Sequence, residues 1–138
     1  KPLLSMLKGW TGQLLPFKGR KIVTYHKNWI YFCDDFGLIQ FDTIEPKPGI
    51  PPSPKHIKEL EESMRQNKVC LILSANYFDE QTVRKVAEAT GATYRMVSYY
   101  VGGTSGVSDY FSLVDHWVKS LLDMAEEAGI SQTNVKKQ

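Results

Sequence analysis

The chain has 138 residues, of which 42% are hydrophobic and 23% are charged, and its formal net charge is +2. This length is enough for one domain with a hydrophobic core of its own. The 17 basic and 15 acidic residues are interspersed, without the basic patch typical of nucleic-acid-binding proteins. No run of residues approaches the ~18 apolar positions of a membrane span. Because the sequence begins at Lys1 without a methionine or signal peptide, we expect a processed product or an excised piece.

The N-terminal part of the chain predicts a helix, a strand and a second helix. Residues 3–15 place leucines and a tryptophan at helical spacing. Residues 21–25, KIVTY, are β-branched and aromatic, as in a strand. Asn28 is expected to cap a helix over 29–36, and Gly37 to end it.

A second strand is predicted over residues 38–44 and is followed by a proline-rich connector, EPKPGIPPSP, over 45–54. So many prolines predict an extended, stiff segment. Ser53 followed by Pro54 is typical of a helix start, with the cap and then proline at the first helical position. The apolar face of this helix consists of Ile57, Leu60 and Met64.

A third strand is predicted over residues 69–73, VCLIL, which are continuously apolar and therefore expected to be covered on both sides. Asp79 is the predicted cap of a helix over 80–90, which Gly91 ends. Residues 93–97, TYRMV, predict the fourth strand.

A glycine-rich segment follows the fourth strand. Its glycines, Gly102, Gly103 and Gly106, do not have the GxGxxG spacing and do not follow the first strand. We therefore interpret the segment as a flexible connector and not as a dinucleotide site. Ser108 is the predicted cap of the longest helix, over 109–128.

Strands and helices thus alternate along the chain. This alternation predicts a parallel sheet between two layers of helices, with right-handed crossovers. Ligands of such sheets bind beyond the carboxyl ends of the strands. The residues expected at this edge are His26, Glu45, Asn76 and Ser98.

Three histidines and two cysteines are the side chains best suited to bind a metal ion. His56 and His116 fall on polar helix faces and are expected to be solvated. His26 is different, because it follows a strand at the ligand-binding edge; the pattern alone leaves a structural role and a metal-binding role open. Cys33 and Cys70 lack metal-binding spacing, and a disulfide between them would be compatible with export. The sequence has no GxSxG or HExxH signature of common hydrolytic sites and no paired carboxylates at a useful spacing.

Three segments resemble the C-terminal lobe of solute-binding proteins of ABC importers for zinc and manganese, the cluster A-I group. They are VTYHKNWIYFCDDFGL, TIEPKPGIPPSPKHIKEL and VRKVAEATGA. The first resembles the family's strand, histidine and helix, the second its PGIxPSPKH connector, and the third its helix ending in TGA. The resemblance covers roughly residues 15–125.

The resemblance implies a metal-binding role for His26, which matches the family's histidine ligand from this lobe. Two other histidines would come from an N-terminal lobe that this chain lacks. Ser98 stands near the place of the family's acidic ligand and would be at most a weak contributor, and Ala75 replaces another acidic residue of the family. The residues expected to line the pocket are Tyr25, Trp29, Asn76 and Tyr99.

The fold that the resemblance implies is an α/β three-layer sandwich, one lobe of a two-lobe binding protein. Its four-stranded parallel sheet is expected in the order 2-1-3-4. Residues 1–15 would be the end of the helix that joins the lobes, 16–128 the C-terminal lobe, and 129–138 a flexible tail.

The resemblance implies a function without catalysis: the capture of Zn²⁺ or Mn²⁺ for a membrane permease, in the periplasm or anchored outside the cell. The complete protein would bind the metal between its lobes, and this lobe alone would bind none tightly. The expected partners are the N-terminal lobe and the permease, with no nucleic acid.

Two alternative functions use the same fold. One is a flavodoxin-like signalling or small-ligand domain, for which the first strand end, TYHKN, lacks the expected acidic or phosphate-binding cluster. The other is an adhesin-type interaction module, in which Tyr99, Tyr100 and the glycine-rich segment would be exposed contact residues.

Overall fold

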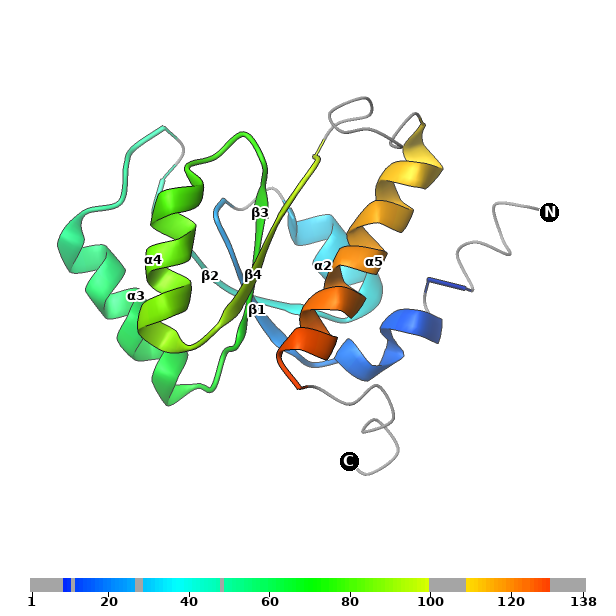
Figure 1. The fold of residues 1–138 in the computed structure, drawn as a ribbon, viewed down its shortest axis with the longest axis horizontal. Coiled ribbons are helices and arrows are strands. Elements are labelled where there is room, and N and C mark those ends of the chain that lie inside the picture. Colours follow the sequence, from blue (N-terminus) through cyan, green and yellow to red (C-terminus); the bar gives the residue numbers. More distant parts are fainter. Residues whose placement is uncertain (1–8, 11, 27–28, 48, 100–108, 130–138) are drawn as a thin grey trace.

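The computed structural model describes residues 9–10, 12–26, 29–47, 49–99 and 109–129. Within these residues, four strands form one parallel sheet in the order β2-β1-β3-β4. The strands are β1 (Lys21–Thr24), β2 (Ile39–Thr43), β3 (Leu71–Ala75) and β4 (Thr93–Val97). Helices cover both faces of the sheet (Figure 1), so the predicted three-layer fold and the predicted strand order are confirmed.

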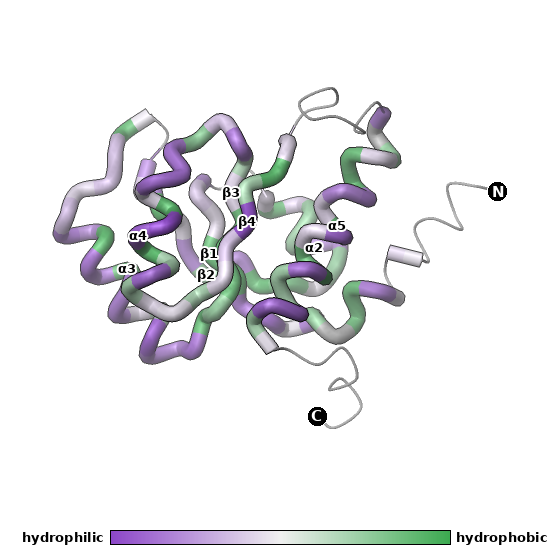
Figure 2. The backbone as a smooth tube through the Cα atoms, in the orientation of Figure 1, coloured by the Kyte–Doolittle hydropathy of each residue, from purple (hydrophilic) through white to green (hydrophobic). Residues whose placement is uncertain are grey.

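Two hydrophobic cores lie on opposite faces of the sheet. Helices α2 (Ile30–Phe36) and α5 (Tyr110–Glu127) cover one face, and helices α3 (Pro54–Gln66) and α4 (Glu80–Thr90) cover the other. Neighbouring residues of a strand point to opposite faces, so Ile22 belongs to the first core and Val23 to the second. The colours in Figure 2 follow this division, since α3 and α4 are mostly hydrophilic whereas α2 and α5 carry more hydrophobic residues.

Residues 9–10 and 12–14 are helical, and a short 3-10 helix, Leu15–Phe17, follows them. Trp10, Leu14 and Phe17 are all buried in the core beside α2 and α5. The Trp10 indole also donates a hydrogen bond to Asp115 of α5, at 3.3 Å. This segment therefore packs as part of the domain, while the predicted positions 1–8 lie outside the described residues.

Most of the predicted helix ends are confirmed. The Ser53 hydroxyl accepts the His56 N–H at 3.1 Å, with Pro54 at the first helical position of α3. Asp79 caps α4 in the same way. Gly37 and Gly91 end α2 and α4 in the left-handed conformation, which glycine adopts without steric cost.

Several predicted boundaries are wrong; β1 and β2 are shorter than predicted and β3 extends to Ala75. β3 begins at Leu71 and not at residue 69, because the Val69 N–H is used to end α3 by bonding the Met64 carbonyl. Helix α2 has Trp29 at its N-cap position and not Asn28, which lies outside the described residues. Helix α5 is capped by Asp109 and not by Ser108, since Asp109 forms a reciprocal capping box with Ser112.

Cys33 and Cys70 are free thiols. Cys33 is buried in the core, and this burial raises its pKa to about 12. Cys70 was predicted to be buried within a strand, but it is half-buried and precedes β3. Among the described helices, none is long and apolar enough to cross a membrane.

The Ser53 cap gives a stability prediction. Replacing Ser53 by Ala should lower the free energy of unfolding by about 1 kcal/mol, because the His56 N–H loses its acceptor. Urea unfolding followed by circular dichroism measures the change. The matched control is Ser53→Gly, which should cost only a few tenths of a kcal/mol; equal stability of Ser53→Ala and the unaltered chain would contradict the predicted role.

Candidate metal site at the strand ends

The carboxyl ends of the four strands lie along one edge of the sheet because the strands are parallel. The pairing of β1 with β2 places Thr24 directly opposite Thr43. The backbone hydrogen bonds between the two segments continue past the ends of both strands. The Ile44 N–H donates to the Thr24 carbonyl and the Glu45 N–H donates to the Tyr25 carbonyl, each at 2.9 Å. The chain segments that carry His26 and Glu45 are therefore held side by side.

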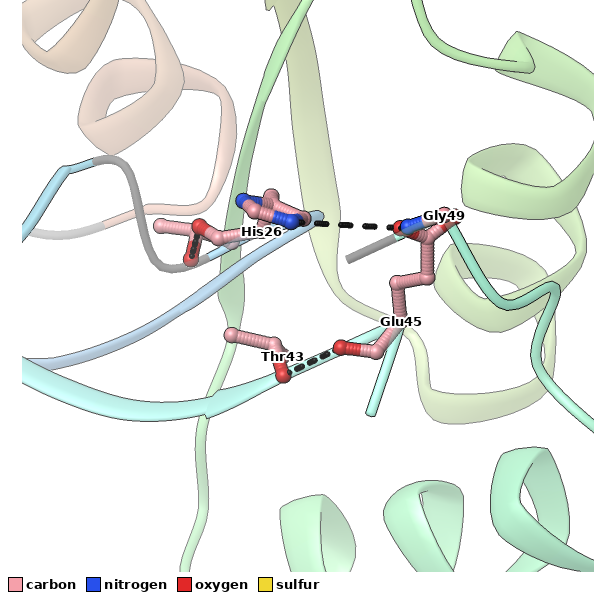
Figure 3. Close-up of polar contacts among 5 residues, drawn as sticks. His26, Thr43, Glu45 and Gly49 are labelled. Carbon is pink, nitrogen blue, oxygen red and sulfur yellow. Dashed lines mark hydrogen bonds and ion pairs between the residues drawn. The ribbon is translucent and has the colours of Figure 1, made fainter. Parts of the chain in front are cut away.

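The two threonines bend the chain in the same way. The Thr24 hydroxyl donates to the carbonyl of His26 at 2.7 Å, and the Thr43 hydroxyl donates to the carbonyl of Glu45 at 2.8 Å. Both threonines are buried. Each strand thus ends in a side-chain-stabilised turn, and each turn presents one polar side chain at the same edge (Figure 3).

His26 and Glu45 face each other across this edge. The His26 Nε2 lies 4.0 Å from a Glu45 carboxylate oxygen, and their side chains are 25% and 12% exposed. That separation is too long for a hydrogen bond. The same carboxylate oxygen accepts the Gly49 N–H at 3.2 Å, so the proline-rich connector holds Glu45 in place (Figure 3).

Aromatic rings support the histidine from the side of α3 and α4. The Phe78 ring lies 5.9 Å from the His26 ring and stacks at 4.4 Å on Tyr25, which is buried. Burial first, and then the negative charges of Glu45 and Asp79, raise the pKa of the Tyr25 hydroxyl. Tyr25 therefore remains a neutral hydrogen-bond donor beside the two carboxylates.

The other predicted site residues do not lie beside His26. Trp29 is 1% exposed and packs edge-to-face against Tyr99 and Trp117 in the core beside α5. Asn76 is exposed and donates its N–H to Val97. The structure therefore brings Tyr25 to His26, and it places Trp29 and Tyr99 together in the core of the other face.

Ser98 is also part of the core beside α5. It is 1% exposed, its N–H donates to His116 Nε2 at 3.2 Å, and its carbonyl accepts the Trp117 indole N–H at 2.6 Å. The main chain of Ser98 thus connects the end of β4 to α5.

Two predictions for histidines are wrong. His56 and His116 are half-buried and hydrogen-bonded, whereas the sequence pattern predicted solvated side chains. His56 donates to the Thr43 carbonyl at 3.1 Å, because α3 begins beside the end of β2. His116 accepts the Ser98 N–H, which requires its Nε2 to be unprotonated.

A groove of about 800 Å³ opens next to the His26–Glu45 pair, between the proline-rich connector, α3 and α4. The polar lining of this groove includes the side chains of Tyr25, Glu45, Asp79, Lys58 and Lys85. A second hollow, of about 640 Å³, lies along β4. Its arginines are already paired with glutamates, Arg84 with Glu80 and Arg95 with Glu127, so it offers less unneutralised charge than the first groove.

The described residues do not bring three or more histidine, cysteine or acidic side chains together at a distance that suits one metal ion. The His26–Glu45 pair offers an imidazole nitrogen and a carboxylate oxygen, both of which are ligands of zinc and manganese. The sequence pattern placed Glu45 at this edge, but nothing in the pattern signalled that it would face His26. What signals it is the register of β1 with β2.

Comparison with known proteins identifies the family to which this chain belongs. The sequence profile of the family described as "Zinc-uptake complex component A periplasmic" matches residues 6–124. Because this match covers most of the chain, the chain belongs to that family. The predicted resemblance is confirmed.

Two curated relatives match the chain at low identity. The iron-binding protein YfeA of Yersinia pestis is 26% identical over 113 residues, which cover 78% of this chain and 35% of YfeA. The zinc-binding lipoprotein AdcA of Streptococcus pneumoniae is 25% identical over 135 residues, which cover 92% of this chain and 26% of AdcA. The chain thus spans about a third or less of the length of these relatives.

Solved structures share the fold. A crystal structure of ZnuA superposes with a TM-score of 0.71 at 21% identity, over 89% of this chain and 44% of that chain. The laminin-binding protein Lmb of Streptococcus agalactiae, described as having adhesin and metal transporting activity, gives a TM-score of 0.69 at 22% identity, over 87% and 46%. FpvC of Pseudomonas aeruginosa in complex with Mn²⁺ gives 0.61 at 21% identity, over 90% and 47%.

The half-buried His116 of α5, which accepts the Ser98 N–H, gives a pH prediction. Burial lowers the pKa of His116, so the unfolded state binds a proton more readily than the folded state does. The stability contribution of His116 should be complete above its unfolded pKa of about 6.5 and should decrease as the pH falls below that value. Urea unfolding at pH values from about 7.5 to 5.5 measures it.

The control is His116→Gln, whose amide oxygen can still accept the Ser98 N–H and does not titrate. The unaltered chain should lose more stability than this variant over the same pH range. Parallel pH dependences of the two proteins would contradict the assignment.

Proposed function

We propose that the chain is the C-terminal lobe of an exported solute-binding protein that captures Zn²⁺ or Mn²⁺ for an ABC importer. Membership of the zinc-uptake family and the shared fold support this proposal. The names of the relatives describe one as iron-binding, one as zinc-binding and one as a complex with Mn²⁺. In this function no covalent bond is made or broken, since the protein only has to hold an ion and release it.

The single observation that carries the proposal is the position of His26. It follows β1 at the carboxyl edge of the sheet, where ligands of parallel α/β folds bind. Its imidazole is 25% exposed, and its main chain is held by the Thr24 hydroxyl. An ion from solvent can therefore reach the imidazole at this edge.

A zinc ion takes about four ligands, so His26 requires ligands from another part of the protein. In our proposal an N-terminal lobe supplies them across a cleft, and residues 1–15 are the end of the helix that joins the two lobes. Residues 16–128 are the metal-binding lobe, and residues 129–138 are a tail. The complete protein works in the periplasm or anchored outside the cell, where it delivers the ion to a membrane permease.

The pocket in this proposal is formed by Tyr25, which supports His26 through Phe78, and by the exposed Asn76 on the same edge. We assign no ligand role to Ser98, because it is 1% exposed and its main chain bonds α5. Trp29 and Tyr99 stabilise the edge from the core beneath it.

The proposal predicts weak metal binding by the chain alone. Calorimetry should give a zinc dissociation constant weaker than about 1 μM, which corresponds to about 8 kcal/mol. Structural zinc sites with a full ligand set gain about 10–16 kcal/mol. The chain should also stay folded in EDTA, because its two cores close without an ion.

Three variants, one for each histidine, test which histidine binds the zinc ion. His26→Ala should abolish the binding, whereas His56→Ala and His116→Gln should retain it, because both of those histidines already bond main-chain atoms. The proposal is wrong if His26→Ala binds zinc as well as the unaltered chain, or if neither protein binds zinc at millimolar concentration.

A further inference from the structure

Glu45 is a largely buried carboxylate, 12% exposed, that the strand register places opposite His26. Burial of a carboxylate is costly unless the charge is paired or hydrogen-bonded. Among the described residues, the ion-pair partner of Glu45 is His26, at 4.0 Å, and Gly49 donates one N–H to it. Lys58 and Lys85 line the same groove without an ion pair to Glu45. A further cation between Glu45 and His26 would account for this arrangement.

The distance between the two side chains suits that cation. Zinc binds histidine nitrogen at about 2.0–2.1 Å and carboxylate oxygen at about 2.0–2.2 Å, so two ligands at a tetrahedral angle lie about 3.4 Å apart. The observed separation of 4.0 Å exceeds a hydrogen bond, and small side-chain rotations would bring it to this value. Similar rotations would also allow a direct hydrogen bond, so the distance fits both roles and the experiment below distinguishes them.

The main chain of both residues and the Glu45 carboxylate are also held in place before any ion binds. The equivalent threonine turns fix the main chain of His26 and Glu45, and the Gly49 N–H fixes the carboxylate (Figure 3). Ligands that are ordered in advance lose less conformational entropy on binding. This preorganisation comes from β1, β2 and the connector, and so from this chain alone.

We propose that Glu45 is a second metal ligand supplied by this chain, beside His26. The inference rests on the proposed function and deepens it, because it replaces the acidic ligand that is missing near Ser98. A nitrogen and a carboxylate oxygen without a thiolate select a divalent ion that accepts hard ligands, which includes Mn²⁺ as well as Zn²⁺. The carboxylate also neutralises one charge of the ion.

The alternative role for Glu45 is to orient His26 by accepting a hydrogen bond from its ring. The two roles respond differently to substitution. Glutamine has nearly the same shape and can still accept hydrogen bonds from His26 and Gly49, but its amide is a poor ligand. Histidine can replace a carboxylate as a ligand but cannot accept the same hydrogen bonds as a glutamate.

The experiment is a titration of the 138-residue chain with Zn²⁺ and with Co²⁺, followed by calorimetry and by the visible absorption of bound Co²⁺. Glu45→Gln should weaken binding by at least about tenfold, which both roles predict. A ligand role also predicts that Glu45→Gln changes the Co²⁺ spectrum and that Glu45→His restores zinc affinity. Glu61→Gln is the control, since Glu61 lines the same groove from α3 and should be unaffected.

The outcomes separate this inference from the proposed function. If His26→Ala abolishes binding while Glu45→Gln binds like the unaltered chain, Glu45 is no ligand and the inference is overturned, although the proposed function stands. If Glu45→Gln and Glu45→His lose affinity equally with an unchanged Co²⁺ spectrum, Glu45 only orients His26. If His26→Ala leaves binding unchanged, the proposed function itself fails.

Discussion

The pairing of β1 with β2, whose register shifts by one residue between Ile22 and Val23, is the constraint on which the candidate site depends. Thr24 lies opposite Thr43, and this alignment sets both turns at the same height along the sheet edge. His26 and Glu45 then meet because each follows its threonine by two residues. A slip of one residue in this pairing would turn the side chains of one strand to the opposite face and would separate the pair.

The two cores stabilise this edge from different sides. The core beneath α2 and α5 buries Trp29 and Trp117. The Ser98 carbonyl, after β4, accepts a hydrogen bond from Trp117 of α5. The core beneath α3 and α4 brings Phe78 against Tyr25. The sheet edge is thus supported on both faces, so its polar side chains can remain ordered while they are open to solvent.

A pair of ligands on one lobe, such as the proposed His26 and Glu45, suits a protein that must release its ion again. Two ligands on one rigid lobe bind an ion weakly, so the ion can leave when the lobes separate. Ligands on a second lobe, joined by a stiff helix, would raise the affinity greatly because binding to them would become intramolecular. In the proposed protein, capture and release would therefore depend on how the lobes meet, and the preorganised His26–Glu45 pair would change little.

The sequence by itself determined the fold class, the cap at Ser53 and the stop at Gly37, because these depend on local patterns and neighbouring residues. The strand order followed from the family resemblance and not from local patterns. It also placed His26 at the sheet edge. Only the tertiary structure decided that Glu45 faces His26 and that Trp29 packs in the opposite core. Those contacts depend on strand register and on the path of the chain between elements, and residues distant in the sequence carry no local signal of where they will meet.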